Sequence, residues 1–297
     1  KNKVMIVIEA NEIPKEVFEW YSKNSNGILA KTISDFGVIT TLLDDVQENF
    51  LYPSQAWASI STGSSASFHK IRWYNDAKPG NNFYWRDASK KGKNVALMNV
   101  LHTGSISDQE TKNYDFVFPD FFCLKPEVSI KKYKKFQNFN HIMSVSSGRK
   151  TSKKTLLLNS LISFLKYPSM SAWGLSFKDY NKWLSVFLSI KNDSETLRNA
   201  QFILQQRIFL DIIKKGLGKD LAVFFTNHVA SCLHRNFHDL TNNLKSDEQK
   251  KLKIYRSMKM LDDFLLEIKK LNSNREILIL SAMGQKLNTK VTNNYKD

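Results

Sequence analysis

Residues 3–14 read KVMIVIEANEIP, and this stretch decides the expected fold. Its first half, residues 3–8, is a continuous apolar run, which is typical of a strand buried on both faces of a parallel sheet. Pro14 then favours the start of a helix, because a proline in the first helical turn lacks only an N–H that would have no partner there. A buried strand followed directly by a helix is the opening unit of an α/β fold.

The same alternation continues along the chain. Further strands are expected at residues 37–43, 93–100, 220–225 and 276–280. Residues 56–60 predict a short helix that ends near Gly63. Residues 246–271 predict one long amphipathic helix, whose start fits a capping box. Strands that alternate with helices indicate a mostly parallel central sheet.

The middle of the chain differs from both ends, because residues 121–190 lack this alternation. Residues 125–154 hold nine Lys and Arg against one acid, and two aromatic-rich helical patterns follow them. We therefore expect three parts: residues 1–120 and 218–297 as two parts of one α/β core, and residues 121–217 as a basic helical insertion or cap. Such a rim could rest on an anionic membrane or hold a lipid-linked phosphate. The alternative is a helical subdomain that packs on the sheet and has its lysines in solvent.

The composition of the 297 residues favours anionic partners. Lys and Arg number 44 against 28 Asp and Glu, which gives a net charge of +16. Such an excess suits nucleic acid, lipid headgroups or phosphorylated substrates, although a coding bias toward Lys, Asn and Ile would produce it as well. Proteins that read bases rely on arginine, and only eight of the cations are Arg. Nucleic acid is therefore the least favoured of these partners.

Cysteine usage and hydropathy indicate the cellular context. Cys123 and Cys232 are the only cysteines; they match no zinc motif and cannot form a disulfide framework. No apolar run reaches the roughly 18 residues of a membrane span, and the first run ends at once in polar residues, so no secretory signal is expected. We expect a cytoplasmic location, with residues 125–154 as the candidate contact to the inner face of a membrane.

Four polar patches follow expected strands, at the edge where open α/β sheets place their sites. They are residues 8–14, 52–71, 226–235 and 281–285. Ser54 would lie at a helix N-terminus, where a nucleophile or phosphate is favoured, with a helix N-cap as the alternative. Asn11 and Glu12 suit a metal or substrate position, with capping of the first turn as the alternative. For His228 and His234 the alternative is a buried or solvated structural histidine.

In order and spacing these patches resemble the alkaline phosphatase superfamily, in particular its phosphodiesterase and nucleotide-pyrophosphatase-like branch. The matching segments are residues 53–63 (PSQAWASISTG), 69–71 (HKI), 230–234 (ASCLH) and 281–284 (SAMG). The resemblance covers residues 3–105 and 218–286, about half of the chain. It implies an α/β sandwich and hydrolysis or transfer of phosphate esters with two divalent ions.

Several positions depart from the family pattern. Asn11 stands where the family has a metal-binding Asp. Pro53 stands at or beside the position of the family's Ser or Thr nucleophile, so the nearest hydroxyl in this chain is that of Ser54. Other acidic or histidine ligands are replaced by Ala230, Ala282 and Met283. His234 is the one ligand kept intact. Because two hard cations need several carboxylates, we expect at most one divalent metal (zinc, manganese or magnesium), with Asn11 and His234 as its candidate ligands.

The leading expectation is an alkaline-phosphatase-like hydrolase or transferase that acts on a phosphorylated substrate. The Asn11-Glu12 opening and the ending at residues 281–285 resemble a divergent branch associated with surface polysaccharide and lipid-linked glycan assembly. Candidate catalytic residues are Ser54, His234 and Glu12, and candidate substrate-binding residues are Asn11, Thr62 and His228. The alternatives are an inactive pseudoenzyme that serves as a binding or assembly subunit, and a nucleic-acid-binding protein by charge alone.

Overall fold

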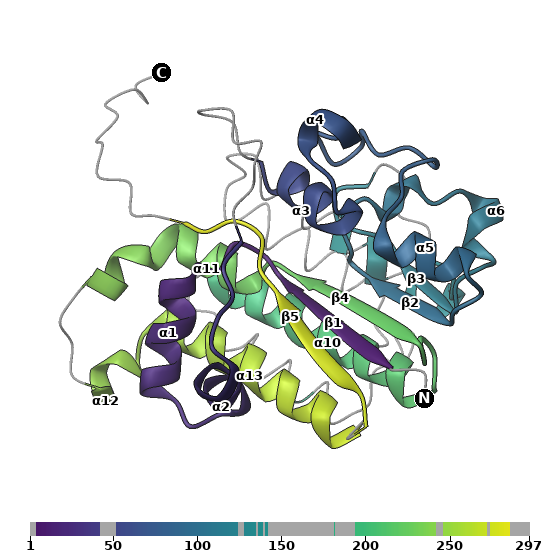
Figure 1. The fold of residues 1–297 in the computed structure, drawn as a ribbon. Coiled ribbons are helices and arrows are strands. Elements are labelled where there is room, and N and C mark those ends of the chain that lie inside the picture. The colour runs from purple at the N-terminus through teal and green to yellow at the C-terminus, as the bar shows by residue number, and fades with distance from the viewer. Residues whose placement is uncertain are drawn as a thin grey trace.

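A five-stranded, all-parallel sheet forms the centre of the part of the chain that the computed structural model describes. The described residues are 4–41, 52–123, 128–134, 136–138, 140–141, 181, 194–241, 246–271 and 274–285. The strand order is β3-β2-β4-β1-β5. Figure 1 shows the sheet with helices on both of its faces. The α/β class with a mostly parallel sheet is therefore confirmed.

Four of the five strands fall on apolar runs that the sequence predicts. The strands are β1 (Met5–Ala10), β2 (Val95–Met98), β3 (Phe116–Phe118), β4 (Leu221–Thr226) and β5 (Glu276–Leu280). β1 lies between β4 and β5, with Ile8 opposite Phe224 on one side and Ile279 on the other. Its carboxyl end therefore lies beside the carboxyl ends of two other strands. The three-residue strand β3 was not expected.

The strand predicted at residues 37–43 is wrong in its described part. Residues 37–41 form neither helix nor strand, and the rest of the range lies outside the described residues. Gly37 ends the preceding helix with a φ of +71°, a left-handed conformation that glycine adopts without strain. Ile39 is 90% exposed, whereas Val38 is partly buried against the core cluster that contains Ile6 and Ile8.

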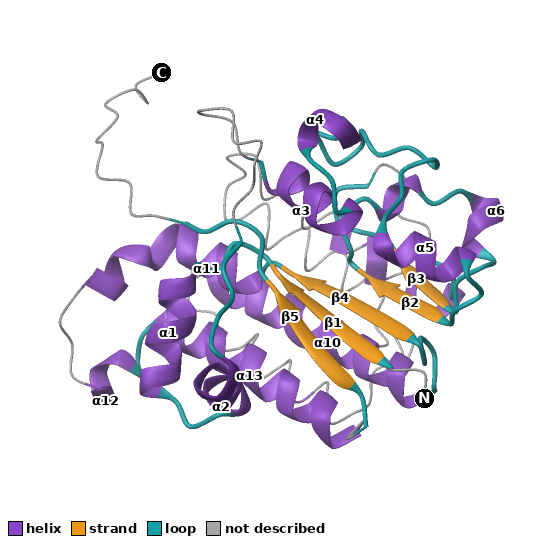
Figure 2. Ribbon diagram, in the orientation of Figure 1, coloured by secondary structure: helices purple, strands orange, loops and turns teal. Residues whose placement is uncertain are grey.

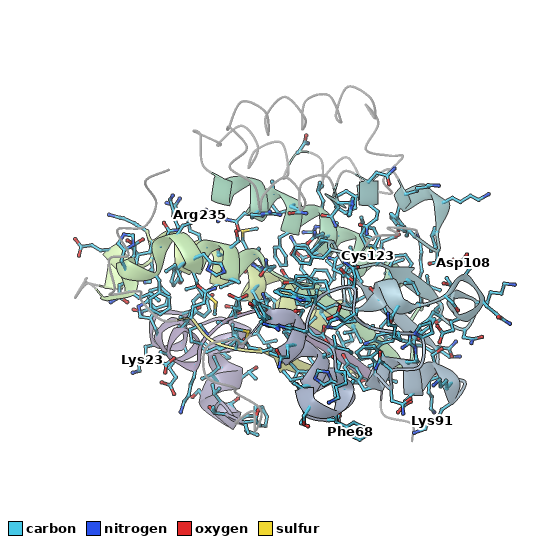
Figure 3. The ribbon with its side chains drawn as sticks, turned by 90° about the horizontal axis from the view of Figure 1, so that it is seen from above. Lys23, Phe68, Lys91, Asp108, Cys123 and Arg235 are labelled. Atoms are coloured by element: carbon cyan, nitrogen blue, oxygen red, sulfur yellow. The ribbon has the colours of Figure 1, made fainter. Side chains whose placement is uncertain are left out.

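Two separate apolar layers cover the sheet, because alternate strand residues face opposite sides. On one side Ile6 and Ile8 pack against α1 (Lys15–Asn24), α2 (Ile28–Phe36), α10 (Ser194–Lys214), α11 (His228–Asn236) and α13 (Lys253–Leu271). On the other side Val7 packs with residues of α3 (Pro53–Thr62) and α5 (Tyr84–Lys90). Figure 2 shows both helical layers, and Figure 3 shows side chains filling the space between them.

Short helical elements join these larger ones. They are α4 (Ala66–His69), η1 (Thr103–Ser105), α6 (Asp108–Thr111), η2 (Lys131–Tyr133), η4 (Phe237–Thr241) and α12 (Ser246–Gln249). α3 matches the predicted helix, and Gly63 caps its end in the left-handed conformation. None of the helices in the described ranges has the length and apolar character that crossing a membrane requires.

The long helix predicted over residues 246–271 is interrupted. α12 ends at Gln249 and α13 begins at Lys253. Between them, the N–H groups of Lys251 and Leu252 donate to carbonyls three residues back, at 3.0 and 3.1 Å, so a tight turn replaces the helical pattern. The apolar stripe is confirmed, since Met258, Phe264 and Leu265 are buried on α13.

Much of the expected insertion at residues 121–217 lies outside the described residues, including nearly all of 142–193. Its last helix, α10, packs directly on the sheet, where Phe202 and Phe209 belong to the same buried cluster as Phe224 of β4. The three-part division of the chain stays a prediction. The basic stretch 125–154 is described only in part, so its contact with a membrane stays a prediction as well.

Candidate functional site

The polar residues that follow β1, β4 and β5 meet at the carboxyl edge of the sheet. The backbone N–H of Asn11 donates to the carbonyl of Thr226 at 3.0 Å, and that of Glu12 donates to the carbonyl of Ala282 at 3.2 Å. Glu12 and Met283 both have positive φ values, +51° and +67°. Such left-handed residues cost conformational energy and often occur at functional sites. The three strand ends are thereby held together by their own backbone.

The carboxylate of Glu12 is the centre of this arrangement. Its Oε1 accepts from Nδ2 of Asn11 at 3.0 Å, and its Oε2 accepts from Nε2 of Gln285 at 2.8 Å. Nε2 of His234 lies 3.1 Å from the same Oε2. Burial raises the pKa of Glu12, but the hydrogen bonds from His234, Gln285 and Asn11 and the charge of His234 outweigh it, so the pKa is lowered. Glu12 is therefore a carboxylate at neutral pH.

The imidazole of His234 lies between the buried carboxylate of Glu12 and solvent. Its side chain is 59% exposed, whereas that of Glu12 is only 9% exposed. Because an ionised carboxylate can only accept, the hydrogen of neutral His234 is placed on Nε2. The lone pair of Nδ1, which has no partner among the described residues, is then available to take a proton. Glu12 thus fixes both the tautomer and the direction of the ring.

Asn11 joins three elements rather than projecting into open space. Its Nδ2 donates to Glu12 and, at 2.8 Å, to Oδ1 of Asn227, which directly precedes α11. Its Oδ1 accepts from the buried indole Nε1 of Trp57 on α3 at 2.7 Å. Both amide hydrogens and one lone pair are therefore occupied. This arrangement makes Asn11 a positioning residue for Glu12 and Asn227.

The metal centre implied by the family resemblance does not fit these residues as a two-ion site. No group of three or more His, Cys, Asp or Glu side chains that could hold a metal lies within the described ranges. Glu12 is the one carboxylate bonded to Asn11 and His234, and two hard cations need several. The assignment of Asn11 and His234 as ligands of a single ion stays a prediction.

Ser54 and Thr62 lie on α3, and the hydroxyl of each donates to a backbone carbonyl. The buried hydroxyl of Ser54 donates to the carbonyl of Arg72 at 2.5 Å. Thr62 donates to the carbonyl of Ala58 at 2.7 Å. Eight residues of α-helix separate the two hydroxyls by about 12 Å along the axis. Their roles as nucleophile and substrate contact stay predictions, and no hydrogen bond joins either to Asn11 or His234.

His228 is buried and both of its ring nitrogens have partners. Nδ1 lies 2.7 Å from Oγ1 of Thr226, and Nε2 lies 3.1 Å from the carbonyl of Ser257. Burial lowers its pKa to about 3, so the ring is neutral. The ring also stacks on Phe202, with centroids 3.7 Å apart. Its observed contacts are those of a core histidine, although one edge borders a pocket.

That pocket lies beside the start of α11, and the sequence did not point to most of its residues. Its lining is Phe121, Phe122, Arg198, Gln201, Gln205, Asn227 and His228. Asn227 connects it to the Glu12 centre through Asn11. Asn227 and Gln285 fall within the polar patches that follow β4 and β5, so their position was a usable signal. Arg198 comes from α10, far from any patch.

The chain was compared with protein-family models, with curated proteins and with solved structures, and none of the three comparisons gave a match. The superfamily resemblance therefore stays a prediction. Function is inferred from what these side chains can do chemically. The groups available are a buried carboxylate, an exposed imidazole that this carboxylate holds, and a neighbouring polar pocket.

Proposed function

We propose that the protein is a hydrolase or transferase that acts on a phosphorylated substrate at the carboxyl edge of the sheet. The observation that carries this proposal is the pair formed by the buried Glu12 carboxylate and the exposed His234 imidazole. A carboxylate that orients a histidine and stabilises its protonated form is a recurring device for general acid–base catalysis. The net charge of +16 favours an anionic substrate.

The reaction assigned to this pair is displacement at phosphorus. Nδ1 of His234 takes the proton of an attacking water or acceptor hydroxyl while the new O–P bond forms. The ester O–P bond breaks, and the leaving oxygen takes up a proton from solvent. Glu12 stabilises the imidazolium until His234 returns its proton to solvent. Because His234 supplies the base, this step does not need the hydroxyl of Ser54.

A lipid-linked or surface-glycan phosphate is the proposed substrate class. This part of the proposal rests on the resemblance of the Asn11-Glu12 pair and residues 281–285 to the glycan-assembly branch. The structure gives those residues a shared location, since Gln285 donates to Glu12 at 2.8 Å. At most one divalent ion is proposed, and no step above passes through it.

A binding or assembly subunit without turnover is the second candidate. It is favoured by the contacts of Asn11 and Ser54, whose polar atoms hold the protein's own structure. In that case Glu12 and His234 would recognise a ligand instead of transferring a proton. The two candidates differ in one observable, the release or transfer of phosphate.

Phosphate release from monoester and diester probes tests the proposal. Nitrophenyl phosphate and bis(nitrophenyl) phosphate should both be offered to the wild-type chain and to His234→Asn. We expect wild-type turnover that falls by about 100-fold or more in the variant, the range of a lost general base. His238→Asn is the matched control, because this exposed histidine contacts Asp239 instead of Glu12.

The control should keep its activity within about twofold, while Glu12→Gln should lose most of it because His234 is no longer held by an anion. Wild-type activity that survives in His234→Asn would overturn the assigned role. No turnover of either probe by the wild-type chain would favour the binding-subunit candidate.

A further inference from the structure

A second cleft lies at the amino edge of the sheet, the edge opposite the Glu12 centre. It has a volume of about 390 Å³ and lies between the loops that lead into β2 and β3. Figure 1 shows these two strands beside each other, with α5 and α6 next to them. We call it the amino-edge cleft, and the residues that line it include Lys90, Lys93, Asn94, Lys112, Asn113 and Asp115. The proposed reaction uses none of these residues.

Hydrogen bonds join the two loops and fix the shape of the amino-edge cleft. Because β2 and β3 are parallel neighbours, the loops that precede them reach the same edge of the sheet. The hydroxyl of Ser89 donates to the carbonyl of Asn113 at 2.9 Å. Nδ2 of Asn94 donates to Oδ1 of Asp115 at 3.1 Å. The cleft is therefore formed by the backbone and its bonded side chains before any ligand is present.

Three lysines line the amino-edge cleft, and in the described part of the chain none of them forms an ion pair. Lys90, Lys93 and Lys112 lack the carboxylate contact that Lys215 makes with Asp211. Lys90 and Lys112 are exposed, and Lys93 is half-buried. Each ammonium group offers three donors and no acceptor, so each is available to an anion.

Asp115, the carboxylate in the described lining of the cleft, is already occupied by the protein's own donors. Its Oδ1 accepts from Nδ2 of Asn94, and its Oδ2 accepts from the N–H of Gly218 at 2.9 Å. Asp220, which directly precedes β4, likewise accepts from the N–H of Asn94 at 2.8 Å. These carboxylates hold the loops together instead of pairing with the lysines, so the positive charge of the cleft is not locally neutralised.

The ends of helices explain only part of this charge. Lys90 ends α5, where a cation complements the helix dipole. Lys93 lies outside that helix, and Lys112 follows the four-residue α6, which is too short for a comparable dipole. Lys91 and Lys219 are exposed on neighbouring positions and add to the positive potential around the cleft. Lysines from three separate loops therefore gather at one place.

We infer that the amino-edge cleft binds a small anion that carries two or more phosphate groups. Its volume lies within the range of small-molecule sites, about 300–1,000 Å³, and its lining of lysine, asparagine and serine suits a charged ligand better than an apolar one. Three ammonium groups from two loops can each contact a different phosphate oxygen, because lysine acts as a flexible point charge. The exposed side-chain amide of Asn113 supplies further donors.

This site would be separate from the Glu12 centre. The six residues of β1 span about 20 Å between the two edges of the sheet, so a small anion in the cleft would not touch Glu12 or His234. The inference therefore does not depend on the proposed function, and either one can fail without the other.

Calorimetric titration of the full chain with pyrophosphate at low salt tests the inference. Inorganic phosphate is the single-phosphate probe and should bind more weakly. Lys90→Gln, Lys93→Gln and Lys112→Gln should each weaken pyrophosphate binding about fivefold or more, and the triple variant should abolish saturable binding. Because none of these lysines is fully buried, each variant should keep the thermal midpoint of the wild type, which shows that it folds.

Two charge-matched variants distinguish a defined site from a general attraction between opposite charges. Lys91→Gln removes a cation that is next to the cleft but does not line it. Lys23→Gln removes one from α1, which Figure 3 places on the far side of the molecule from Lys91. Both should keep their affinity for pyrophosphate within about twofold. Equal losses in all of the single variants, or no saturable binding by the wild type, would overturn the inference.

Further probes identify the source of the phosphate groups. Tripolyphosphate offers them in free form, and phosphatidylcholine vesicles that contain phosphatidylinositol bisphosphate offer them at a membrane. Binding of the free probes without binding to the vesicles would assign a soluble ligand. Vesicle binding that the triple variant loses would assign a lipid headgroup. Binding of pyrophosphate that the triple variant leaves unchanged would overturn the inference.

Discussion

Replacement of Glu9 by Gln should make the protein more stable at pH 8 but change its stability little at pH 5. Glu9 lies in β1, between Phe225 of β4 and Leu280 of β5, and is only 1% exposed. Burial raises the pKa of its carboxyl to about 7, although the Tyr84 hydroxyl, which donates to Oε1 at 2.9 Å, lowers it in part. The interior strand β1 therefore carries a carboxyl that titrates near neutral pH.

The size of this change in stability follows from the pKa of Glu9 in the folded and the unfolded chain. Between pH 4.5 and about 7 the folded chain keeps a proton that the unfolded chain has released. The free energy of unfolding therefore falls as the pH rises through this window. The gap between the two pKa values corresponds to about 3 kcal/mol, at about 1.4 kcal/mol per pKa unit. Most of it, about 2–3 kcal/mol, is lost between pH 5 and pH 8.

Urea denaturation at both pH values measures this effect. Gln keeps the Oε1 acceptor for Tyr84 but cannot ionise, so the stability of Glu9→Gln relative to the wild type should rise by about 2–3 kcal/mol from pH 5 to pH 8. Any constant cost of packing the amide cancels in this comparison. Glu16→Gln, which removes an exposed carboxylate from α1, should show no such rise. A difference for Glu9→Gln that stays within about 0.5 kcal/mol between the two pH values would refute the reasoning.

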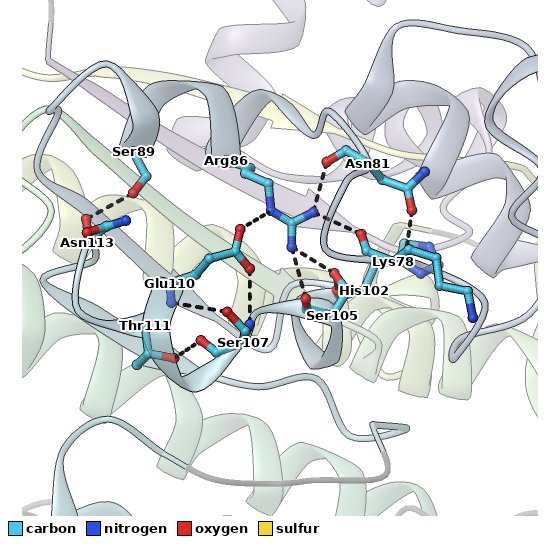
Figure 4. A network of polar contacts seen from close by, with 10 residues as sticks. All are labelled: Lys78, Asn81, Arg86, Ser89, His102, Ser105, Ser107, Glu110, Thr111 and Asn113. Carbon is cyan, nitrogen blue, oxygen red and sulfur yellow. Dashed lines mark hydrogen bonds and ion pairs between the residues drawn. The ribbon is translucent and has the colours of Figure 1, made fainter.

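Two further predictions concern buried polar contacts. Figure 4 shows the buried Arg86 guanidinium, which donates to the carbonyls of Lys78, Asn81 and Ser105 and pairs with Glu110. Glu110→Gln removes the negative charge of this pair, so it should lower the free energy of unfolding by about 1.5–3 kcal/mol in urea denaturation. An unchanged midpoint would show that the carbonyls alone satisfy Arg86. Gly27→Ala should also lower the free energy of unfolding, by about 1–3 kcal/mol, because the added Cβ would lie 1.5 Å from Oδ2 of Asp262. The carboxylate of Asp262 accepts hydrogen bonds from the Tyr21 hydroxyl and from the N–H of Leu29 in α2, and the clash would disturb both. A thermal midpoint equal to that of the wild type would contradict this contact.

Three of the four strands that the sequence predicted correctly are buried along almost their whole length, whereas the fourth, β5, is partly exposed. β1, β2 and β4 are covered on both faces, so their residues form continuous apolar runs that stand out without any structural knowledge. β3 is three residues long, too short for a run to be distinguished from a loop. The run at residues 37–43 gave the same signal, yet its described residues form no strand and Ile39 is 90% exposed, because burial depends on neighbours that the local sequence does not show.

The site was predictable where its residues follow strands. Asn11, Glu12, Ser54 and His234 were expected in one pocket. Glu12 contacts Asn11 and His234, whereas the hydroxyl of Ser54 bonds to the carbonyl of Arg72. The contact between Gln285 and Glu12 joins residues 273 positions apart, and local patterns contain no information on such pairs. Arg198 was not predictable for a similar reason, since an arginine in a long helix gives no signal until the fold places it at the pocket.

The tautomer of His234, measured by long-range proton–nitrogen NMR, tests the central claim most directly. The signal can be assigned by its loss in His234→Asn and recorded above the pH at which the imidazole titrates. We expect the hydrogen on Nε2 and a bare Nδ1 in the wild type, and a loss of this preference in Glu12→Gln, because the carboxylate is what holds the Nε2 hydrogen. A hydrogen on Nδ1, or a spectrum that Glu12→Gln leaves unchanged, would contradict the role of Glu12 and His234 as the proton-transfer pair.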